Sequence, residues 1–313
     1  MKNELLRSYN LTPDFAIKLI NVSENQTYRI DCSDGQTFAL RVARPMYHTH
    51  AEYNSEIAWI EALRTQTPIR VAKPIAGHDG NYVQNVHGQS ALMFEWVEGA
   101  EPKIGDDLEH LATQLGALSA RLHDHALHWE KPPLFTRPRW DFDAAFGTKM
   151  RWGDWRKGLG VEAHMLPLLS RTVNEVECKL AVYGHGPQRF NLIHGDLRLA
   201  NLLRDGDHIT LIDFDDCGFG WLMYDAATLI SFHEHEPQAA QMIMQWINAY
   251  RTRRVITPED QSAIHTLIMF RRILLLAWLG SHSEIELASE VKATFALQSL
   301  DLCERFLTFG SVF

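Results

Sequence analysis

One segment of the sequence, residues 190–216, concentrates polar side chains within an apolar stretch and constrains the fold more than any other. Asp196 precedes Asn201 by five residues, and Asp213 follows Asn201 by twelve. An Asp-Gly pair within 205–207 lies between two apolar runs, which predicts a hairpin with a tight turn. The hairpin returns Asp213 toward Asp196 and Asn201. Three oxygen-bearing side chains at one edge suit Mg²⁺ and polyphosphate, because Mg²⁺ prefers oxygen ligands and takes only a few of them from protein.

The spacing of these residues resembles that of a known family. His-Gly-Asp-x4-Asn over 194–201, followed by Ile-Asp-Phe-Asp over 212–215, is similar to the motif pair of the aminoglycoside phosphotransferase and choline kinase superfamily, which has a protein-kinase-like fold. The resemblance implies ATP as the phosphate donor and Asp196 as the residue that accepts or orients the proton of the acceptor hydroxyl. It also implies that Asn201 and Asp213 hold Mg²⁺.

The resemblance extends to the N-terminal third, where it implies the residues that align ATP. Arg41 occupies the position of the family's phosphate-binding lysine, and Glu56 occupies that of the paired glutamate. Arginine is not equivalent to lysine there, because its planar guanidinium binds in a bidentate manner, but it can pair with Glu56 and with phosphate. Phe94 and Trp96 lie in a segment similar to the hinge that holds adenine through main-chain groups.

The glycine-rich loop that covers the phosphates in many kinases has no counterpart in this sequence. Residues 21–28 occupy the corresponding place and contain no Gly-x-Gly-x-x-Gly pattern. Ser23 and Asn25 in this segment offer hydroxyl, amide or main-chain donors to phosphate.

Four features of the C-terminal two thirds carry further expectations. Arg198, two residues after the proposed base, either contacts the transferred phosphate or forms a structural salt bridge, and the two interpretations are equally favoured. The insert at 129–155 interleaves four tryptophans with Arg and Asp residues, so it either lines the acceptor site or packs against the helical lobe. His123 is expected to end a helix, where a cation is favourable. Asp225 resembles the structural aspartate that follows the metal site in the family.

The pattern as a whole predicts an α+β fold with a β-rich part and a helical part, and the resemblance implies that this fold is bilobal and protein-kinase-like. The expected domains are a β-rich, nucleotide-binding lobe at 1–96, a connector at 97–107 and a mainly helical, catalytic and acceptor-binding lobe at 108–313. Periodicity and turn signals predict strands at 26–32, 37–42, 90–96, 201–204 and 208–212, and helices at 51–63, 108–123, 161–183, 237–251 and 258–281.

Composition narrows the partners and the compartment. Among 313 residues, 30 are Lys or Arg and 39 are Asp or Glu, and the resulting formal charge of −9 gives no general attraction to nucleic acid or anionic lipid. The four cysteines are scattered without metal-ligand spacing, which is typical of reduced thiols. The N-terminus has no apolar stretch of signal-peptide length, and the apolar run at 273–279 is far shorter than the roughly 20 residues of a membrane span. We therefore expect a cytoplasmic protein with no nucleic-acid or membrane partner, and the sequence indicates no oligomeric state.

The acceptor is expected to be the hydroxyl of a small molecule, such as a homoserine-like or choline-like amino alcohol or an aminoglycoside. Only twelve positions separate Asp213 from Asp225, and no Ala-Pro-Glu segment is present, so a long activation loop for peptide substrates has no room. Residues 270–279 resemble both type II homoserine kinases and the bacterial stress-response kinase branch, so a protein Ser/Thr kinase is one alternative. A nucleotide-binding pseudokinase scaffold is another, because of Arg41.

Overall fold

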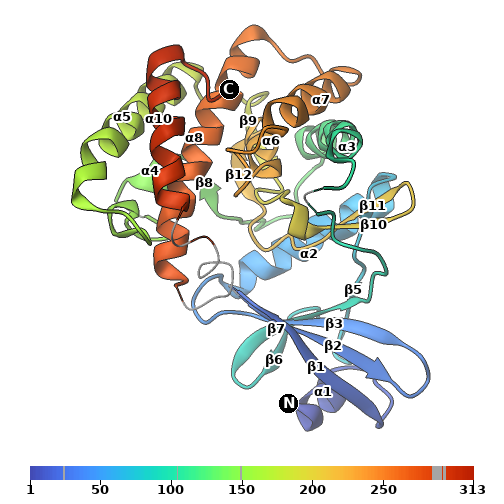
Figure 1. The fold of residues 1–313 in the computed structure, drawn as a ribbon. Helices are drawn as coiled ribbons and strands as arrows, with labels where there is room; N and C mark the ends of the chain where they lie inside the picture. The colour runs from blue at the N-terminus through green and yellow to red at the C-terminus, as the bar shows by residue number, and fades with distance from the viewer. Residues whose placement is uncertain (24, 104, 149, 284–290, 292–293) are drawn as a thin grey trace. The chain divides into compact units, whose positions relative to one another are not determined.

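The computed structural model describes residues 1–23, 25–103, 105–148, 150–283, 291 and 294–313. Figure 1 shows the chain as a ribbon, and its described part divides into two compact units. Unit 1 comprises Met1–Ala100, Glu130–Arg137 and Leu203–Asp215, and unit 2 comprises Glu101–Trp129, Pro138–Leu202 and Asp216–Phe313. The domain boundaries expected from the sequence remain predictions, and the expected connector includes residue 104, which lies outside the described residues.

Unit 1 contains most of the β-structure. Its elements are α1 (Lys2–Ser8), β1 (Phe15–Val22), β2 (Gln26–Cys32), β3 (Thr37–Val42), α2 (His50–Gln66), β4 (Arg70–Val71), β5 (Pro74–Ile75), β6 (Gln84–Val86), β7 (Gln89–Glu95), most of β10 (Leu202–Asp205) and β11 (His208–Leu211). The strands form an antiparallel sheet in the order β1-β2-β3-β7-β5, with β6 paired to β7, and a small sheet in the order β10-β11-β4.

The core of unit 1 lies between the large sheet and α1. Ile30 of β2 and Leu40 of β3 are fully buried, together with Val86 of β6. Leu5 of α1 and Tyr9, which follows it, join the same cluster. One face of the sheet is thus covered by apolar side chains from the N-terminus, as expected for an antiparallel sheet that buries alternate residues.

Helix α2 begins at a capping box and carries one buried charge. The Thr49 side chain accepts a hydrogen bond from the Glu52 main chain, and the Glu52 side chain accepts one from the Thr49 main chain. Trp59 and Leu63 are fully buried on its apolar face. Glu56 is buried on the same helix, so it requires a cationic partner.

The predicted hairpin at the end of the chemical motif is present as β10 and β11. Its turn contains Gly206 with a φ of 58°, a left-handed conformation that glycine adopts without strain. Strand β11 pairs in parallel with β4, through Thr210 opposite Arg70. This pairing fixes the direction in which the chain leaves β11 toward Asp213 within unit 1.

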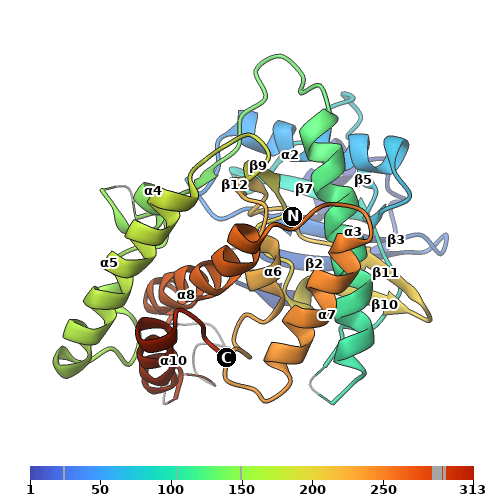
Figure 2. The ribbon, with the colours of Figure 1, turned by 90° about the horizontal axis from the view of Figure 1, so that it is seen from above.

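Unit 2 is mainly helical. Its elements are α3 (Leu108–His128), β8 (Arg139–Trp140), α4 (Phe142–Phe146), η1 (Trp155–Lys157), η2 (Ala163–Met165), α5 (Leu166–Tyr183), β9 (Phe190–Ile193), η3 (Leu199–Asn201), β12 (Gly218–Trp221), α6 (Tyr224–Leu229), α7 (Ala239–Arg251), α8 (Pro258–Ser281) and α10 (Phe295–Phe309). Figure 2 shows α7 beside α3, and α8 beside α5 and α10, in agreement with the packing of these pairs.

Helix α8 forms the centre of unit 2. It starts at a capping box between Thr257 and Asp260, and nearly all of its residues from Ala263 to Leu279 are buried. Among the described helices, α8 is long and apolar enough to cross a bilayer by length and composition, but 89% of its most apolar window is buried inside the protein. That degree of burial is typical of a core helix.

A small sheet of unit 2 positions the start of the loop that carries Asp196. Strand β12 pairs antiparallel with β9 and parallel with β8, and β9 ends at Ile193, directly before the His-Gly-Asp motif. A Cβ on Gly220 of β12 would lie 2.5 Å from Cδ1 of Ile193, so the Ile193 side chain packs directly against Gly220.

The α+β class expected from the sequence is confirmed, and most predicted elements are found within a few residues of their predicted bounds. The strands at 26–32 and 37–42 and the helix at 258–281 are confirmed in full. The prediction for 108–123 is too short, because α3 continues to His128, and within 161–183 the α-helix begins only at Leu166. Elements α1, β1 and α10 are additional to the predicted set.

Candidate active site

The loop that carries Asp196 follows β9, and buried groups of unit 2 hold its main chain. Asp225, in the first turn of α6, is fully buried. Its Oδ1 accepts a hydrogen bond from the Gly195 N–H (2.8 Å), and its Oδ2 accepts one from the His194 N–H (3.2 Å). Nε2 of His123 lies 3.0 Å from the same Oδ2. Asp225 therefore fixes the backbone that presents Asp196, in the role that the resemblance implied.

His123 corrects one expectation from the sequence. It does not end a helix, because α3 continues to His128 and the His123 side chain is fully buried. Its Nδ1 lies 2.9 Å from the Tyr250 hydroxyl oxygen, while its Nε2 faces Asp225. These partners are 127 and 102 positions away, so no local sequence signal reveals the pairing.

The Asp196 carboxylate accepts hydrogen bonds at both of its oxygens. Oδ2 accepts from Nε of Arg198 (3.1 Å) and from Nδ2 of Asn201 (2.6 Å). Oδ1 accepts from a terminal nitrogen of Arg271. Burial alone would raise the pKa of Asp196, but the positive charges of Arg271 and Arg198 hold this pKa below its usual value. Unit 2 thus brings together Asp196, Arg198 and Asn201 as predicted, and in this structure Arg198 forms an ion pair with Asp196.

Arg271 of α8 is a site residue that the sequence motifs did not predict. Its side chain is only 3% exposed. Nε donates to the Ser231 hydroxyl (3.1 Å), and Nη1 donates to the Tyr224 hydroxyl (3.2 Å). The guanidinium also lies over the Trp152 ring, 5.3 Å from its centre. The only sequence signal for this role is a pair of arginines within an otherwise apolar helix, since such charges are rarely buried without a partner.

The orientation of Asn201 fits a hard metal ion. Nδ2 donates to the main-chain oxygen of Asp196 (2.9 Å) as well as to its carboxylate, so both amide hydrogens are used. The amide oxygen of Asn201 is therefore turned away from Asp196. Among the described residues, no three His, Cys, Asp or Glu side chains gather as a metal site. The amide oxygen of Asn201 in unit 2 and the carboxylate of Asp213 in unit 1 are each a donor of the type that Mg²⁺ prefers, and their joint role as metal ligands remains a prediction.

In unit 1, three predicted residues meet around one guanidinium. Nη2 of Arg41 donates to both carboxylate oxygens of Glu56 (2.7 Å each), and Nη1 donates to Oδ1 of Asp213 (3.3 Å). Arg41 and Glu56 are both buried. Burial alone would lower the pKa of Arg41, but the carboxylates of Glu56, Asp215 and Asp213 raise it. Arg41 thus remains charged and joins β3, α2 and the segment after β11.

Asp213 combines an unusual backbone conformation with an accessible carboxylate. Its φ is 57°, which is unusual for a residue other than glycine and persists only where the surroundings fix the chain. Its side chain is 42% exposed, so the carboxylate remains accessible while Arg41 holds one oxygen.

Arg137 holds the main chain next to Asp213 in place within unit 1. Its side chain is fully buried and donates to the main-chain oxygens of Asp215 and Glu52, the latter at 2.9 Å. It also reaches the Phe214 main-chain oxygen (3.5 Å) and lies 4.0 Å from Oε2 of Glu56. Arg137 thus ties the backbone directly after Asp213 to α2. The sequence placed Arg137 only within the 129–155 insert.

Ser23 and Asn25 lie in the segment that occupies the place of the glycine-rich loop. Nδ2 of Asn25 donates to Oδ2 of Asp215 (2.9 Å), and its Oδ1 accepts from the Arg44 N–H (3.2 Å). The amide of Asn25 is therefore engaged with unit 1 itself. Ser23 is half-buried, and its N–H donates to the main-chain oxygen of Asn25 (3.0 Å). Residue 24 lies outside the described residues, and phosphate contacts of Ser23 and Asn25 remain predictions.

The two predicted hinge residues lie at the end of β7. The Arg41 guanidinium lies 5.7 Å from the centre of the Phe94 ring. The N–H of Trp96 already donates to the main-chain oxygen of Thr37 (3.1 Å). An adenine contact at Trp96, which remains a prediction, would therefore use its carbonyl oxygen.

The four tryptophans of the insert pack within unit 2 rather than forming an exposed wall. Trp140, Trp152 and Trp155 are all buried, and Trp129 is half-buried against His125. Of the two interpretations left open, packing thus describes these side chains. The packing still supports the site, because Trp152 contacts Arg271.

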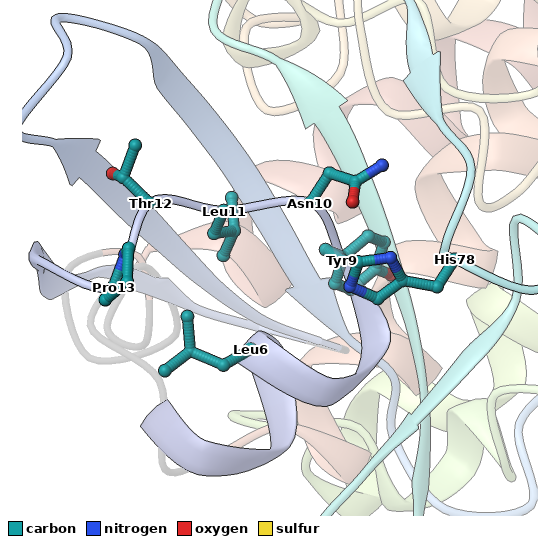
Figure 3. Close-up of a pocket in the computed structure, with 7 residues that line it drawn as sticks. All are labelled: Leu6, Tyr9, Asn10, Leu11, Thr12, Pro13 and His78. Carbon is teal, nitrogen blue, oxygen red and sulfur yellow. The ribbon is translucent and has the colours of Figure 1, made fainter.

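An open pocket of about 550 Å³ lies beside α1, away from the predicted residues. Figure 3 shows its lining, which includes Leu6, Tyr9, Pro13 and His78. None of the residues predicted for catalysis, nucleotide or metal binding lines this pocket.

Comparison with known proteins agrees with the motif resemblance. The model of the phosphotransferase enzyme family matches residues 17–258. Amicoumacin kinase of Bacillus subtilis (strain 168) is 25% identical over 234 residues, which cover 72% of this chain and 66% of that protein. Homoserine kinase of Janthinobacterium sp. (strain Marseille) is 26% identical over 221 residues, which cover 68% of this chain and 64% of that protein. The matches span slightly less than two thirds of these curated relatives.

A solved structure is similar over the full length. The microcompartment-associated aminopropanol kinase is 37% identical, with a TM-score of 0.91, and the match covers 100% of this chain and 98% of that one. Spectinomycin phosphotransferase, at 12% identity and a TM-score of 0.64, shares the fold. The superfamily and the protein-kinase-like fold expected from the sequence are confirmed: the chain belongs to the phosphotransferase enzyme family.

Proposed function

We propose that this protein transfers the γ-phosphoryl group of ATP to the hydroxyl of a small amino alcohol. The observation that carries the proposal is the Asp196 carboxylate, which is ionised, only 13% exposed and fixed by Arg198, Asn201 and Arg271. A fixed carboxylate of this kind orients a hydroxyl and accepts its proton as the phosphoryl group is transferred.

The remaining predicted residues have roles that follow from their chemistry. Arg41, held by Glu56, aligns the phosphates of ATP. The positive charge of Arg198 offsets the negative charge of the phosphoryl group that is transferred beside Asp196. We propose Asn201 and Asp213 as the ligands of Mg²⁺, which when bound neutralises the charge of the phosphate oxygens. Catalysis then consists mainly of positioning and electrostatic stabilisation.

The choice of acceptor class rests on the named relatives. The full-length structural neighbour is named an aminopropanol kinase, and one curated relative is named a homoserine kinase. Both names denote compounds that carry an amino group and a hydroxyl group. A small acceptor also agrees with the short distance in sequence between Asp213 and Asp225.

An acceptor screen tests the proposal. The purified full-length protein is incubated with ATP and Mg²⁺ and with aminopropanols, ethanolamine, homoserine, choline or an aminoglycoside, and the product is identified by mass spectrometry. Propanediol serves as the matched acceptor that lacks the amine. We expect a phosphorylated amino alcohol and much slower reaction of propanediol. Transfer of labelled phosphate only to proteins of a cell lysate, or nucleotide binding without turnover, would contradict the proposal in favour of a protein kinase or a scaffold.

We further propose that the protein acts in the cytoplasm, without nucleic-acid or membrane partners. The four cysteines, Cys32, Cys178, Cys217 and Cys303, are free thiols, which is typical of a reducing compartment. The net charge of −9 supports the absence of a nucleic-acid partner.

A further inference from the structure

We propose that Arg271 is a positioning residue that directs one oxygen of Asp196, Oδ1, toward the acceptor hydroxyl. The inference rests on the proposed function, because it concerns how the acceptor is oriented. It assigns a role to a residue of α8 that lies 75 positions from Asp196 in sequence.

The hydrogen-bond capacity of Asp196 indicates which oxygen serves the substrate. An ionised carboxylate offers about four acceptor sites, two on each oxygen. Oδ2 already accepts from Arg198 and Asn201, so its two sites are used. Oδ1 accepts from Arg271 and, among the described hydrogen bonds, from no other group. One site on Oδ1 is therefore left for the acceptor hydroxyl.

Arg271 is held firmly enough to fix this geometry. Nε and Nη1 are engaged by Ser231 and Tyr224, so Nη2 is the nitrogen directed at Asp196. The Trp152 ring supports one face of the guanidinium. A planar fork with three engaged nitrogens holds its partner in one orientation, whereas the single ammonium of lysine does not.

Helix α6 holds both Arg271 and the main chain of the loop that carries Asp196. Tyr224 holds the guanidinium of Arg271, and the next residue, Asp225, holds the N–H groups of His194 and Gly195. Adjacent residues of α6 thus fix the backbone and, through Arg271, the side chain of the same motif. Arg271 acts through Asp196, so its effect on turnover requires the Asp196 carboxylate.

The neighbouring arginine provides a matched control. Arg272 is also fully buried on α8, but it donates to Glu234 (2.5 Å), to Ser299 (2.8 Å) and to the Phe295 main-chain oxygen (2.8 Å). Arg272 thus links α8 to α10. Replacement of Arg272 therefore measures how much stability is lost when a buried arginine on α8 is disturbed.

The test is a double-mutant cycle with steady-state kinetics. Arg271→Lys and Tyr224→Phe are each made in the wild-type protein and in Asp196→Asn, with Arg272→Lys as the control. We expect Arg271→Lys to lower kcat by about tenfold or more and Tyr224→Phe by about threefold, with KM for ATP changed less than about twofold. In Asp196→Asn, either substitution lowers kcat by less than about twofold further. Arg272→Lys lowers the melting temperature while kcat stays within about twofold.

The outcomes separate this inference from the proposed function. Equal fractional losses in the two backgrounds, or wild-type kcat in both Arg271→Lys and Tyr224→Phe, overturn the role of Arg271 even when the wild-type protein phosphorylates its acceptor. If Arg271→Lys does not fold, Tyr224→Phe completes the cycle, because it keeps the charge. A wild-type protein that phosphorylates no acceptor overturns the proposed function and this inference together.

Discussion

A Cβ atom on Gly195 would lie 2.7 Å from the main-chain oxygen of Asp216. That oxygen also accepts a hydrogen bond from Nε1 of Trp140 (2.7 Å), so the Asp216 backbone is held in place against Gly195. Gly195 has a φ of 81°, a conformation that side chains other than glycine rarely adopt. The motif therefore needs glycine for two independent reasons.

We predict that Gly195→Ala destabilises the protein and impairs turnover. The left-handed conformation costs about 1–2 kcal/mol for alanine, and the contact with Asp216 adds about 1–3 kcal/mol. Gly206→Ala is the control, because Gly206 also has a positive φ but no atom lies within 4 Å of its added Cβ. Urea denaturation and kcat are measured for both variants. Equal stability of the two variants would show that the approach of Asp216 is unimportant.

Arg137 is predicted to stabilise the segment directly after Asp213. Arg137→Met leaves the main-chain oxygens of Phe214 and Asp215 without their buried donor, and loss of one partner of a buried charged network costs about 3–5 kcal/mol. Arg137→Lys restores the charge but not the fork, so it is intermediate. Hydrogen exchange of the amides at 212–216 is expected to be fastest in Arg137→Met.

The control for Arg137 is a surface pair on α2. Arg64 pairs with Glu61 at 2.8 Å with both side chains partly exposed, so Arg64→Met changes stability by less than about 1 kcal/mol. Exchange at 212–216 that responds equally to Arg64→Met and Arg137→Met would refute the role given to Arg137.

Arg41→Lys is predicted to weaken nucleotide binding, although lysine is the usual residue in the family. A lysine ammonium cannot serve both oxygens of Glu56 and also Asp213, so at least one charged hydrogen bond is lost. Such a bond contributes about 1.5 kcal/mol, which corresponds to about tenfold in affinity. Calorimetric titration with ATP and Mg²⁺ measures the change. Wild-type affinity in Arg41→Lys would mean that the bidentate pair with Glu56 does not matter for ATP.

The stabilising effect of Glu52 is predicted to decline in acid. Burial alone would raise the pKa of Glu52, but the His48 imidazole, whose Nδ1 lies 3.7 Å from Oε2 of Glu52, and hydrogen bonds from Thr49 lower it to about 2. Because the pKa is lower in the folded protein, the stabilisation is full above the unfolded value of about 4.5 and is lost as pH falls toward 2. It amounts to at most about 3 kcal/mol at pH 7 and less than half of that at pH 3.

Urea unfolding of the wild type and of Glu52→Gln at the two pH values measures this decline. The difference in unfolding free energy between the two proteins should shrink as the pH is lowered. Glu61→Gln is the exposed control on the same helix, with a difference below about 1 kcal/mol at both pH values. A Glu52→Gln difference that stays constant from pH 7 to pH 3 would disprove the prediction.

The sequence was sufficient to predict those strands and turns whose conformation depends on residues close by in the chain. The alternation in β2 and β3 and the Asp-Gly turn before β11 were sufficient to place those strands, because register and turn conformation are fixed within a few residues. Likewise, the spacing of Asp196 and Asn201 was sufficient to predict that they meet. Strand β1 was not predicted, since most of its residues are exposed and no buried alternation marks it.

The supporting groups of the site could not be predicted in the same way. His123 and Arg271 reach the catalytic loop from helices far away in sequence, and Arg137 reaches the Asp213 segment from the insert. Each is a buried polar residue, and burial of a charge requires a partner whose identity depends on tertiary packing. Sequence periodicity marks such residues as unusual but does not name their partners.

The rate of phosphoryl transfer in Asp196→Asn tests most sharply whether Asp196 acts on the acceptor hydroxyl. Asparagine preserves the shape of the side chain but cannot accept the hydroxyl proton. With the best acceptor from the screen, we predict that kcat falls by about 10²- to 10⁴-fold while the affinity for ATP stays within about twofold. Turnover at the wild-type rate in Asp196→Asn would contradict the central claim that Asp196 acts on the acceptor hydroxyl.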